Sequence, residues 1–118
     1  MGRVKPEDIV DRGVYGCFDG DKLMYVGSSY CSLNTLQYNH RNWYNKYGEQ
    51  GRTHFRTELL NQGNSWRFAW IVLPYKCDQE DNETQEGNQI NLFRPPLNKD
   101  LDPVGTSVYR GRYTRKVR

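Results

Sequence analysis

The sequence predicts a small α/β domain in which helices flank a three-stranded, mostly antiparallel sheet. Two runs of β-type composition near the N-terminus are joined by an Asp-Gly turn signal, and a third run, rich in aromatic and β-branched residues, lies in the second half. Segments with helical spacing lie between the second and third runs and after the third. This order favours one sheet with helices packed against it. At 118 residues, the chain has the length of one ordinary domain.

The first two strands are predicted as a β-hairpin. Residues 14–18 (VYGCF) and 22–27 (KLMYVG) have the composition of strands, and residues 19–21 (DGD) stand between them. Asp-Gly between two such runs is a strong signal for a tight turn. The polar residues 28–32 are predicted as a loop.

Two helices are predicted after the hairpin. Residues 32–47 are expected to form one helix, with Ser32 as its N-cap and Gly48 as its stop. Apolar and aromatic residues recur there in steps of three and four, as one helical face requires. These residues are Leu33, Leu36, Tyr44 and Tyr47. Residues 53–60 are expected to form the second helix, which ends at residues 61–63 (NQG).

The third strand and the last helix follow. Residues 66–73 (WRFAWIVL) are the strongest strand candidate, and Pro74 is expected to close it. The acidic residues 78–83 favour a helix N-terminus. The helix that they open carries Glu86 and is expected to end at residues 95–96 (PP), because proline cannot continue a helix. From residue 99 onward the sequence shows little periodicity.

The composition indicates a folded domain in a reducing compartment. Aromatic residues make up 14% of the chain, whereas disordered chains contain few. No apolar run approaches the roughly 18 residues of a membrane span, and the N-terminus has no apolar signal core. Cys17, Cys31 and Cys77 are an odd number without a CxxC pair. A disulfide framework or a cysteine zinc site is therefore not expected, and the cytoplasm is the expected location.

The net charge of +3 is unevenly distributed. Residues 110–118 contain five of the 17 basic residues and no acid, which leaves 12 basic and 14 acidic residues in the first 109. A basic tail adds sequence-independent affinity for nucleic acid. The alternative is a solvated end of the chain.

Two blocks of the sequence resemble the GIY-YIG nuclease family. Residues 13–15 (GVY) and 25–27 (YVG), with nine residues between them, resemble its paired signature. In residues 86–98, a glutamate, an apolar residue, a proline and an asparagine resemble its later motif. The resemblance spans 13–98, so it predicts a nuclease domain over residues 1–98 and a basic tail over 99–118. It implies a single-domain DNA endonuclease of the type found in phages and mobile elements, located in the host cytoplasm if phage-encoded.

The resemblance implies a set of catalytic residues. Phosphodiester hydrolysis needs a base for the attacking water and positive charge on the phosphate. Mg²⁺ or Mn²⁺ supplies that charge and often uses only one or two carboxylates. Glu86 is the implied metal ligand, and Glu80 or Glu83 replaces it if the helix register differs. Tyr15 is expected to activate the water and Tyr25 to position it, since neighbouring strands bring the two side chains close. No small-molecule cofactor is expected.

The helix after the hairpin departs from the family's pattern. Many members carry an arginine shortly after the second tripeptide and a histidine one helical turn later. With one extra loop residue, these positions fall on Leu36 and His40. Arg41 either serves the phosphate from a shifted position or is the family arginine after a longer loop, and a domain without catalysis is a third reading. His40 is expected to contact water or phosphate, and Asn98 to hold the loop beside the site through its amide.

The expected partner is DNA, bound by a monomer or a homodimer, with no membrane partner. Neither a phosphate-binding glycine loop nor a Ser-His-Asp arrangement is present, so nucleotide hydrolysis and acyl transfer lack support. The alternatives are an inactive nucleic-acid-binding module on the same fold and an enzyme that cuts RNA or branched DNA. The residues expected to contact nucleic acid are Lys22, Arg52, Arg56, Arg110, Arg112, Arg115, Lys116 and Arg118.

Overall fold

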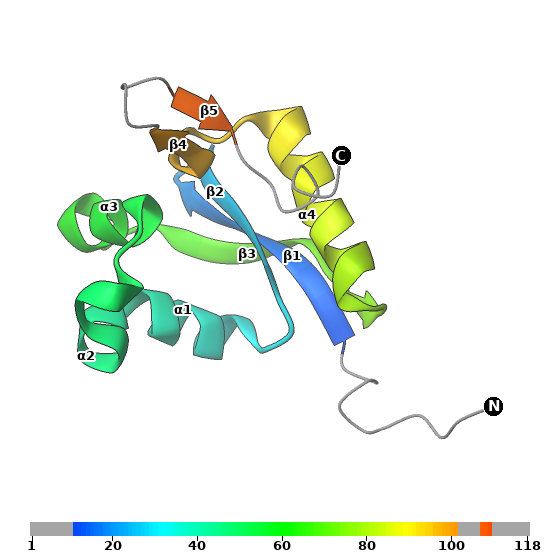
Figure 1. The fold of residues 1–118 in the computed structure, drawn as a ribbon, viewed down its shortest axis with the longest axis horizontal. Helices are drawn as coiled ribbons and strands as arrows, with labels where there is room; N and C mark the ends of the chain where they lie inside the picture. The colour runs from blue at the N-terminus through cyan, green and yellow to red at the C-terminus, as the bar shows by residue number, and fades with distance from the viewer. Residues whose placement is uncertain (1–10, 102–106, 110–118) are drawn as a thin grey trace.

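A computed structural model describes residues 11–101 and 107–109 (Figure 1). It confirms the predicted α/β fold with a three-stranded antiparallel sheet and flanking helices. The elements, with η for a 3₁₀ helix, are β1 (Asp11–Asp19), β2 (Lys22–Ser29), α1 (Leu33–Arg41), α2 (Trp43–Tyr47), η2 (Gly48–Gly51), α3 (His54–Gln62), β3 (Arg67–Lys76), α4 (Gln79–Phe93), η3 (Pro96–Asn98), β4 (Lys99–Leu101) and β5 (Ser107–Tyr109).

The sheet has the order β2-β1-β3, and both neighbouring pairs are antiparallel. The predicted hairpin is confirmed, with Asp19 opposite Lys22 across a two-residue turn. Gly20 has a φ of 60°, which glycine adopts without a steric penalty. Tyr15 stands opposite Gly27, and this register places the two tripeptides of the sequence signature side by side.

The third strand continues beyond Pro74, which was expected to close it. β3 pairs only with β1 and is therefore an edge strand of the sheet. Tyr75 and Lys76 still pair with Arg12 and Asp11. An edge strand tolerates proline because one side of its backbone has no neighbour that needs an N–H group.

The expected single helix over residues 32–47 is two helices, which meet at Asn42. The backbone of Asn42 is not helical, with φ −109° and ψ 27°, and its side-chain Nδ2 donates to the Tyr38 carbonyl at 3.0 Å. Asparagine side chains compete in this way with helical hydrogen bonds. The break turns Trp43 into the core and leaves Tyr44 and Tyr47 exposed, contrary to the expected apolar face. Ser32 is the N-cap of α1, as predicted.

Helices pack against both faces of the sheet. One buried cluster joins Cys17 of β1 to Phe55 and Leu59 of α3, and a second joins Val14 of β1 to Ile90 of α4. Cys17 and Val14 are an odd number of positions apart, so their side chains point to opposite faces. Figure 1 shows α1, α2 and α3 grouped on one side of the hairpin and α4 on the other.

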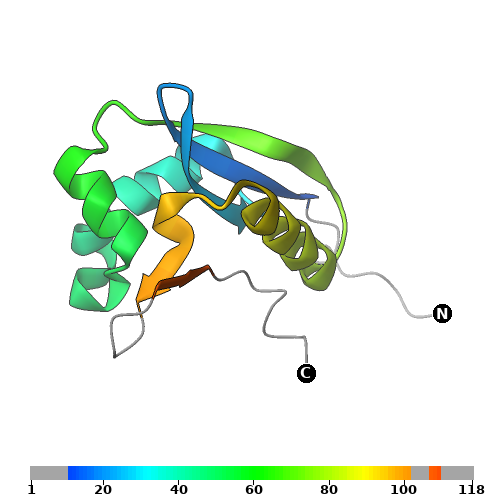
Figure 2. The same ribbon diagram turned by 90° about the horizontal axis from the view of Figure 1, so that it is seen from above.

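The segment predicted as a basic tail begins with a small two-stranded sheet. β4 pairs with β5 in antiparallel register, an element that the sequence pattern did not predict. Figure 2 shows this pair set apart from the three-stranded sheet. In the part of the chain that the structure describes, no helix is long and apolar enough to cross a membrane. Cys17, Cys31 and Cys77 are free thiols.

Candidate functional site

A hydrogen-bonded chain of three side chains connects the hairpin to α1 and α3. The hydroxyl of Tyr15 lies 2.8 Å from Nε2 of His40. Nε of Arg56 donates to Nδ1 of the same ring at 3.0 Å. A guanidinium has only donors, so Nδ1 carries no proton, and the neutral imidazole carries its proton on Nε2. His40 therefore donates to the oxygen of Tyr15.

The environment favours the neutral forms of both ring side chains. Burial, assisted by the Arg56 guanidinium, lowers the pKa of His40 to about 3. Burial raises the pKa of Tyr15 well above its ordinary value, and Tyr25 and Glu86 add to the increase. A cation bound close to the Tyr15 hydroxyl would oppose this increase, because an opposite charge favours the ionised form. Tyr15 therefore needs such a cation to act as a base.

Glu86 supplies a buried carboxylate whose charge acts on Tyr15. Its side chain is 7% exposed. It lies one helical turn before Ile90, whose packing against Val14 and Val26 fixes this face of α4 against the hairpin. Within residues 11–101 and 107–109, no group of three His, Cys, Asp or Glu residues is placed to hold a metal. The carboxylate oxygens of Glu86 suit Mg²⁺ or Mn²⁺, because such ions need few protein ligands and keep several waters.

Tyr25 forms the partly exposed side of the site. Its ring stacks on Phe55, with 3.9 Å between centroids and 5° between planes, and lies 6.2 Å from the ring of Tyr15. Phe68 completes the cluster, at 5.9 Å from Tyr15 and 6.1 Å from His40. Phe55 and Phe68 were not among the predicted site residues. The four-residue step from Phe55 to Leu59 on α3 was the signal for a buried helical face.

Gly27 provides the space in which Tyr15 lies. A Cβ atom at this position would overlap the phenol ring and hydroxyl of Tyr15, the residue opposite it in the hairpin. Any larger residue would therefore displace the hydroxyl from His40. The second tripeptide therefore needs glycine at position 27, because Tyr15 of the first tripeptide occupies the space that a side chain would fill.

Replacing Gly27 by alanine is expected to lower the free energy of unfolding by about 1–3 kcal/mol, the usual cost of overpacking. The same substitution in a Tyr15→Ala background should cost less than about 0.5 kcal/mol, because the ring that the methyl group meets is gone. Urea unfolding of wild type, Gly27→Ala, Tyr15→Ala and the double variant measures the coupling between the two positions. Additive costs in the double variant would show that Tyr15 is not the obstacle.

Asn98 holds the outer edge of β2. Its Oδ1 accepts from the Val26 amide at 2.8 Å, and its Nδ2 donates to the Val26 carbonyl at 2.9 Å. The amide was expected to hold a loop, and its partner is instead the strand residue next to Gly27. The side chain thus fixes β2 at the point where Tyr15 crosses it.

Arg41 connects three elements around the site. Its guanidinium donates to Gln37 Oε1 at 3.0 Å, to the Gly63 carbonyl at 2.9 Å and to the Trp66 carbonyl at 2.6 Å. These bonds join α1 to the end of α3 and the start of β3. A phosphate contact for Arg41 stays a prediction, and Arg56 is the arginine that contacts His40.

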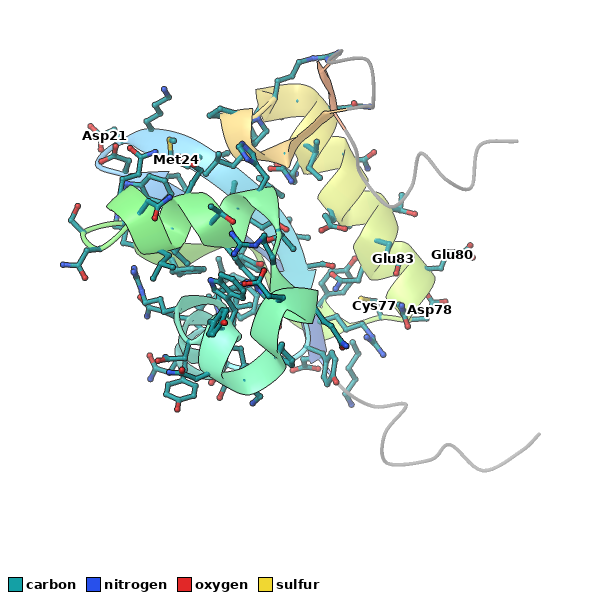
Figure 3. The ribbon with its side chains drawn as sticks, turned by 60° about the vertical axis from the view of Figure 1, so that its left-hand side comes forward. Asp21, Met24, Cys77, Asp78, Glu80 and Glu83 are labelled. Atoms are coloured by element: carbon teal, nitrogen blue, oxygen red, sulfur yellow. The ribbon has the colours of Figure 1, made fainter. Side chains whose placement is uncertain are left out.

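The other predicted residues lie around this centre. Arg52 is exposed and pairs with Glu49 at 2.9 Å, and Lys22 is exposed beside the hairpin turn. Glu83 is buried and Glu80 exposed on the first half of α4, where Figure 3 shows both far from Asp21 at the hairpin turn. Three further candidates, Arg110, Arg112 and Arg115, lie outside the described residues, as do Lys116 and Arg118.

The free energy of unfolding is expected to fall as the pH is lowered from 6.5 toward 3. The folded state resists protonation of His40 while the unfolded state accepts the proton, so His40 alone contributes up to about 1.4 kcal/mol per pH unit in this window. Urea unfolding of wild type and His40→Gln between pH 4 and 7 measures this contribution. The variant should show the flatter dependence. Parallel curves for wild type and His40→Gln would exclude this role of His40.

Comparisons of the chain with protein-family models, with curated proteins and with solved structures found no match. The site brings together the side chains of Tyr15, Tyr25 and His40, with Asn98 on the adjacent strand edge. Glu86 is buried on α4, and its charge acts on Tyr15.

Proposed function

We propose that the chain is a metal-dependent endonuclease that hydrolyses phosphodiester bonds in DNA. The observation that supports this most directly is the Tyr15 hydroxyl, which contacts His40 and lies in the field of the buried Glu86 carboxylate. A phenol oxygen, an N–H donor aimed at it and an adjacent carboxylate are the groups needed to activate a water next to a hard cation.

Each residue has a distinct role in the proposed reaction. A divalent ion supplies positive charge for the phosphate and the leaving oxygen when it is bound. Glu86 would hold that ion, and Tyr15, once ionised, would take the proton of the attacking water. His40 stabilises the phenolate through Nε2–H, and Arg56 fixes the tautomer that makes this bond available. Tyr25 limits the position of the substrate on the open side of the cluster.

A nucleic-acid-binding module without catalysis is the second candidate. Leu36 stands where the resemblance leads us to expect an arginine, and its side chain is buried. Arg41, the alternative arginine, already donates to three protein acceptors. These two observations favour a module that has lost its phosphate-binding arginine.

Incubation with supercoiled plasmid and Mg²⁺ or Mn²⁺ distinguishes the two candidates. We expect nicked or linear plasmid from wild type and from Glu58→Ala, a control on α3, and intact plasmid from Glu86→Ala. Parallel reactions with linear duplex, branched DNA and RNA identify the substrate. If wild type binds DNA in a gel-shift assay but leaves every substrate intact with both metals, the binding module is correct and the endonuclease proposal is not.

The proposed enzyme acts in the cytoplasm, in keeping with its three free thiols. Each chain carries one candidate site. Cutting both strands then requires either a homodimer or two successive nicks by a monomer. The ratio of nicked to linear plasmid at early times separates these two cases.

A further inference from the structure

Exposed aromatic rings gather on α2, the short helix that follows the helix of His40. Tyr44 and Tyr47 are 55% and 43% exposed and lie three positions apart, so they are neighbours on the helix surface. The ammonium group of Lys46 lies 6.0 Å from the centroid of the Tyr47 ring. We call Tyr44, Tyr47 and Lys46 the α2 face. The proposed reaction does not use these three side chains.

One side chain connects the α2 face to the candidate site. The Arg56 guanidinium lies 5.1 Å from the centroid of the Tyr47 ring, and its Nε donates to Nδ1 of His40 at 3.0 Å. The other nitrogen of the His40 ring contacts the Tyr15 hydroxyl. Only Arg56 and His40 therefore stand between Tyr47 and Tyr15 in this series of contacts. A strand with a phosphate at Tyr15 would have its neighbouring nucleotides beside the α2 face.

A hollow of about 310 Å³ adjoins the α2 face. Its walls are Tyr38 of α1, Asn42 between the two helices, and Asn45 and Lys46 of α2. Tyr38 is 62% exposed and adds a third accessible aromatic ring. Lys46 belongs to both the hollow and the α2 face, so the aromatic surface continues from α2 to α1.

The charge of the molecule differs between its two sides. Residues 33–57, which span α1, α2, η2 and the start of α3, contain four basic residues and one acid. Residues 78–93, which form α4 and its cap, contain five acids and no basic residue. Figure 1 shows these two segments on opposite sides of the hairpin. A polyanion is therefore attracted to the side of α1, α2 and α3 and repelled by α4.

The composition of the surface restricts the class of partner. The exposed side chains of α1, α2 and η2 are tyrosines, amides, a threonine and charged groups, and none of them is aliphatic. A helix that lies on a membrane or docks in an apolar protein groove presents an apolar face instead. Aromatic rings among cations are typical of surfaces that bind single-stranded nucleic acid. Because duplex bases already stack on one another, only unpaired bases can offer their faces to these rings.

We propose that the α2 face and the adjoining hollow bind unpaired nucleotides of a DNA strand. Bases stack on the exposed tyrosine rings, and the Lys46 ammonium lies against the phosphates between them. This inference rests on the proposed function, because the bound nucleotides belong to the strand whose phosphate lies at Tyr15. The preferred substrate is then DNA with a single-stranded segment beside the cut, such as branched DNA, rather than a fully paired duplex.

Fluorescence anisotropy without divalent metal measures binding separately from cleavage. The probes are a labelled oligothymidylate, which stays single-stranded, and a duplex of the same length. Tyr38→Ala and Tyr44→Ala should each weaken single-strand binding at least about fivefold and leave duplex affinity unchanged. Tyr44→Phe keeps the ring and should match wild type. Phe93→Ala removes an exposed ring from the acidic helix α4 and is the matched control.

The salt dependence of binding tests the role of the cation. Lys46→Gln should lower the slope of log affinity against log salt concentration by about 0.7 for the single strand, the value for one lost phosphate contact. An unchanged slope would exclude Lys46 from the strand-binding surface. Circular dichroism verifies that each variant is folded.

Three results would overturn the α2 face as a single-strand site. Tyr44→Ala and Tyr38→Ala could bind the single strand as tightly as wild type, or lose affinity equally for both probes. Tyr44→Phe could be as weak as Tyr44→Ala, which would assign binding to the hydroxyl rather than to the ring. Sedimentation could show self-association that disappears in Tyr44→Ala, which would make the face a contact between copies of the chain.

The cleavage assay separates this inference from the proposed function. Any of these three results in a chain that cleaves plasmid would remove the single-strand site and leave the endonuclease intact. A selective loss of single-strand binding in the alanine variants of a chain that cleaves no substrate would support strand binding and remove the endonuclease proposal. Selective loss together with faster cleavage of branched DNA than of linear duplex would support both.

Discussion

Replacing Glu86 by glutamine should reduce cleavage of DNA by at least about a hundredfold, a loss of roughly 2.7 kcal/mol of transition-state stabilisation. Glutamine keeps the shape of the side chain in its buried position on α4 and removes the negative charge that would hold a divalent ion. The same change removes a negative charge that helps to raise the pKa of Tyr15. Without a bound cation, the loss of that charge does not suffice to ionise the Tyr15 hydroxyl. DNA binding, which depends on basic groups, should persist.

Single-turnover cleavage and gel-shift assays on the same preparations measure these two effects. Glu80→Gln, at an exposed position on the same helix, is the matched control and should cleave at the wild-type rate. Glu83→Gln tests the neighbouring buried carboxylate one turn earlier. Full activity in Glu86→Gln together with a loss in Glu83→Gln would move the metal ligand to Glu83. Circular dichroism and urea unfolding verify that each variant is folded.

Local sequence chemistry was sufficient to predict the hairpin that carries the site. The Asp-Gly turn pairs Asp19 with Lys22, and a one-residue irregularity between Cys17 and Phe18 then shifts the register so that Tyr15 stands opposite Gly27. Ser32, the predicted cap of α1, is likewise local, because its side chain accepts from an amide three residues later. The acidic run that was expected to open the last helix begins at Asp78, which is the cap of α4. The turn and the N-cap of α1 were therefore predicted correctly, whereas the helix break at Asn42 and the register shift in the hairpin, which are also local, were not.

Other features that were missed depend on contacts between distant segments. Pro74 lies inside β3 because that strand is at an edge of the sheet, which the residues around Pro74 do not reveal. Arg56 reaches His40 because α3 packs against α1, although the two residues are 16 apart in sequence. Arg41, next to His40 in the sequence, is directed instead to carbonyl groups near the start of β3. Packing between elements, rather than residue type, decides which arginine adjoins the site.

Replacing Asn98 by alanine is expected to lower the free energy of unfolding by about 2–6 kcal/mol. The substitution leaves the buried amide and carbonyl of Val26 without partners, and each unmatched buried group costs about 1–3 kcal/mol. The contact joins residues 72 positions apart, so it forms only when the last part of the domain docks on β2. Urea unfolding measures the loss, and Asn91→Ala, exposed on α4, is the control. A loss no greater than that of the control would mean that water replaces the amide.

Asn98→Asp separates the two hydrogen bonds. An ionised aspartate still accepts from the Val26 amide but turns a second oxygen toward the Val26 carbonyl, where two acceptors repel. Protonation gives the side chain an O–H donor, so the folded state favours the protonated form and the pKa of the new aspartate should be raised. Relative to wild type, this variant should therefore be least stable at neutral pH and should recover as the pH falls toward 4. If the stability difference from wild type does not change with pH, the hydrogen bond to the Val26 carbonyl contributes nothing. The hydrogen bond to the Val26 amide would then be the one that holds η3 against β2.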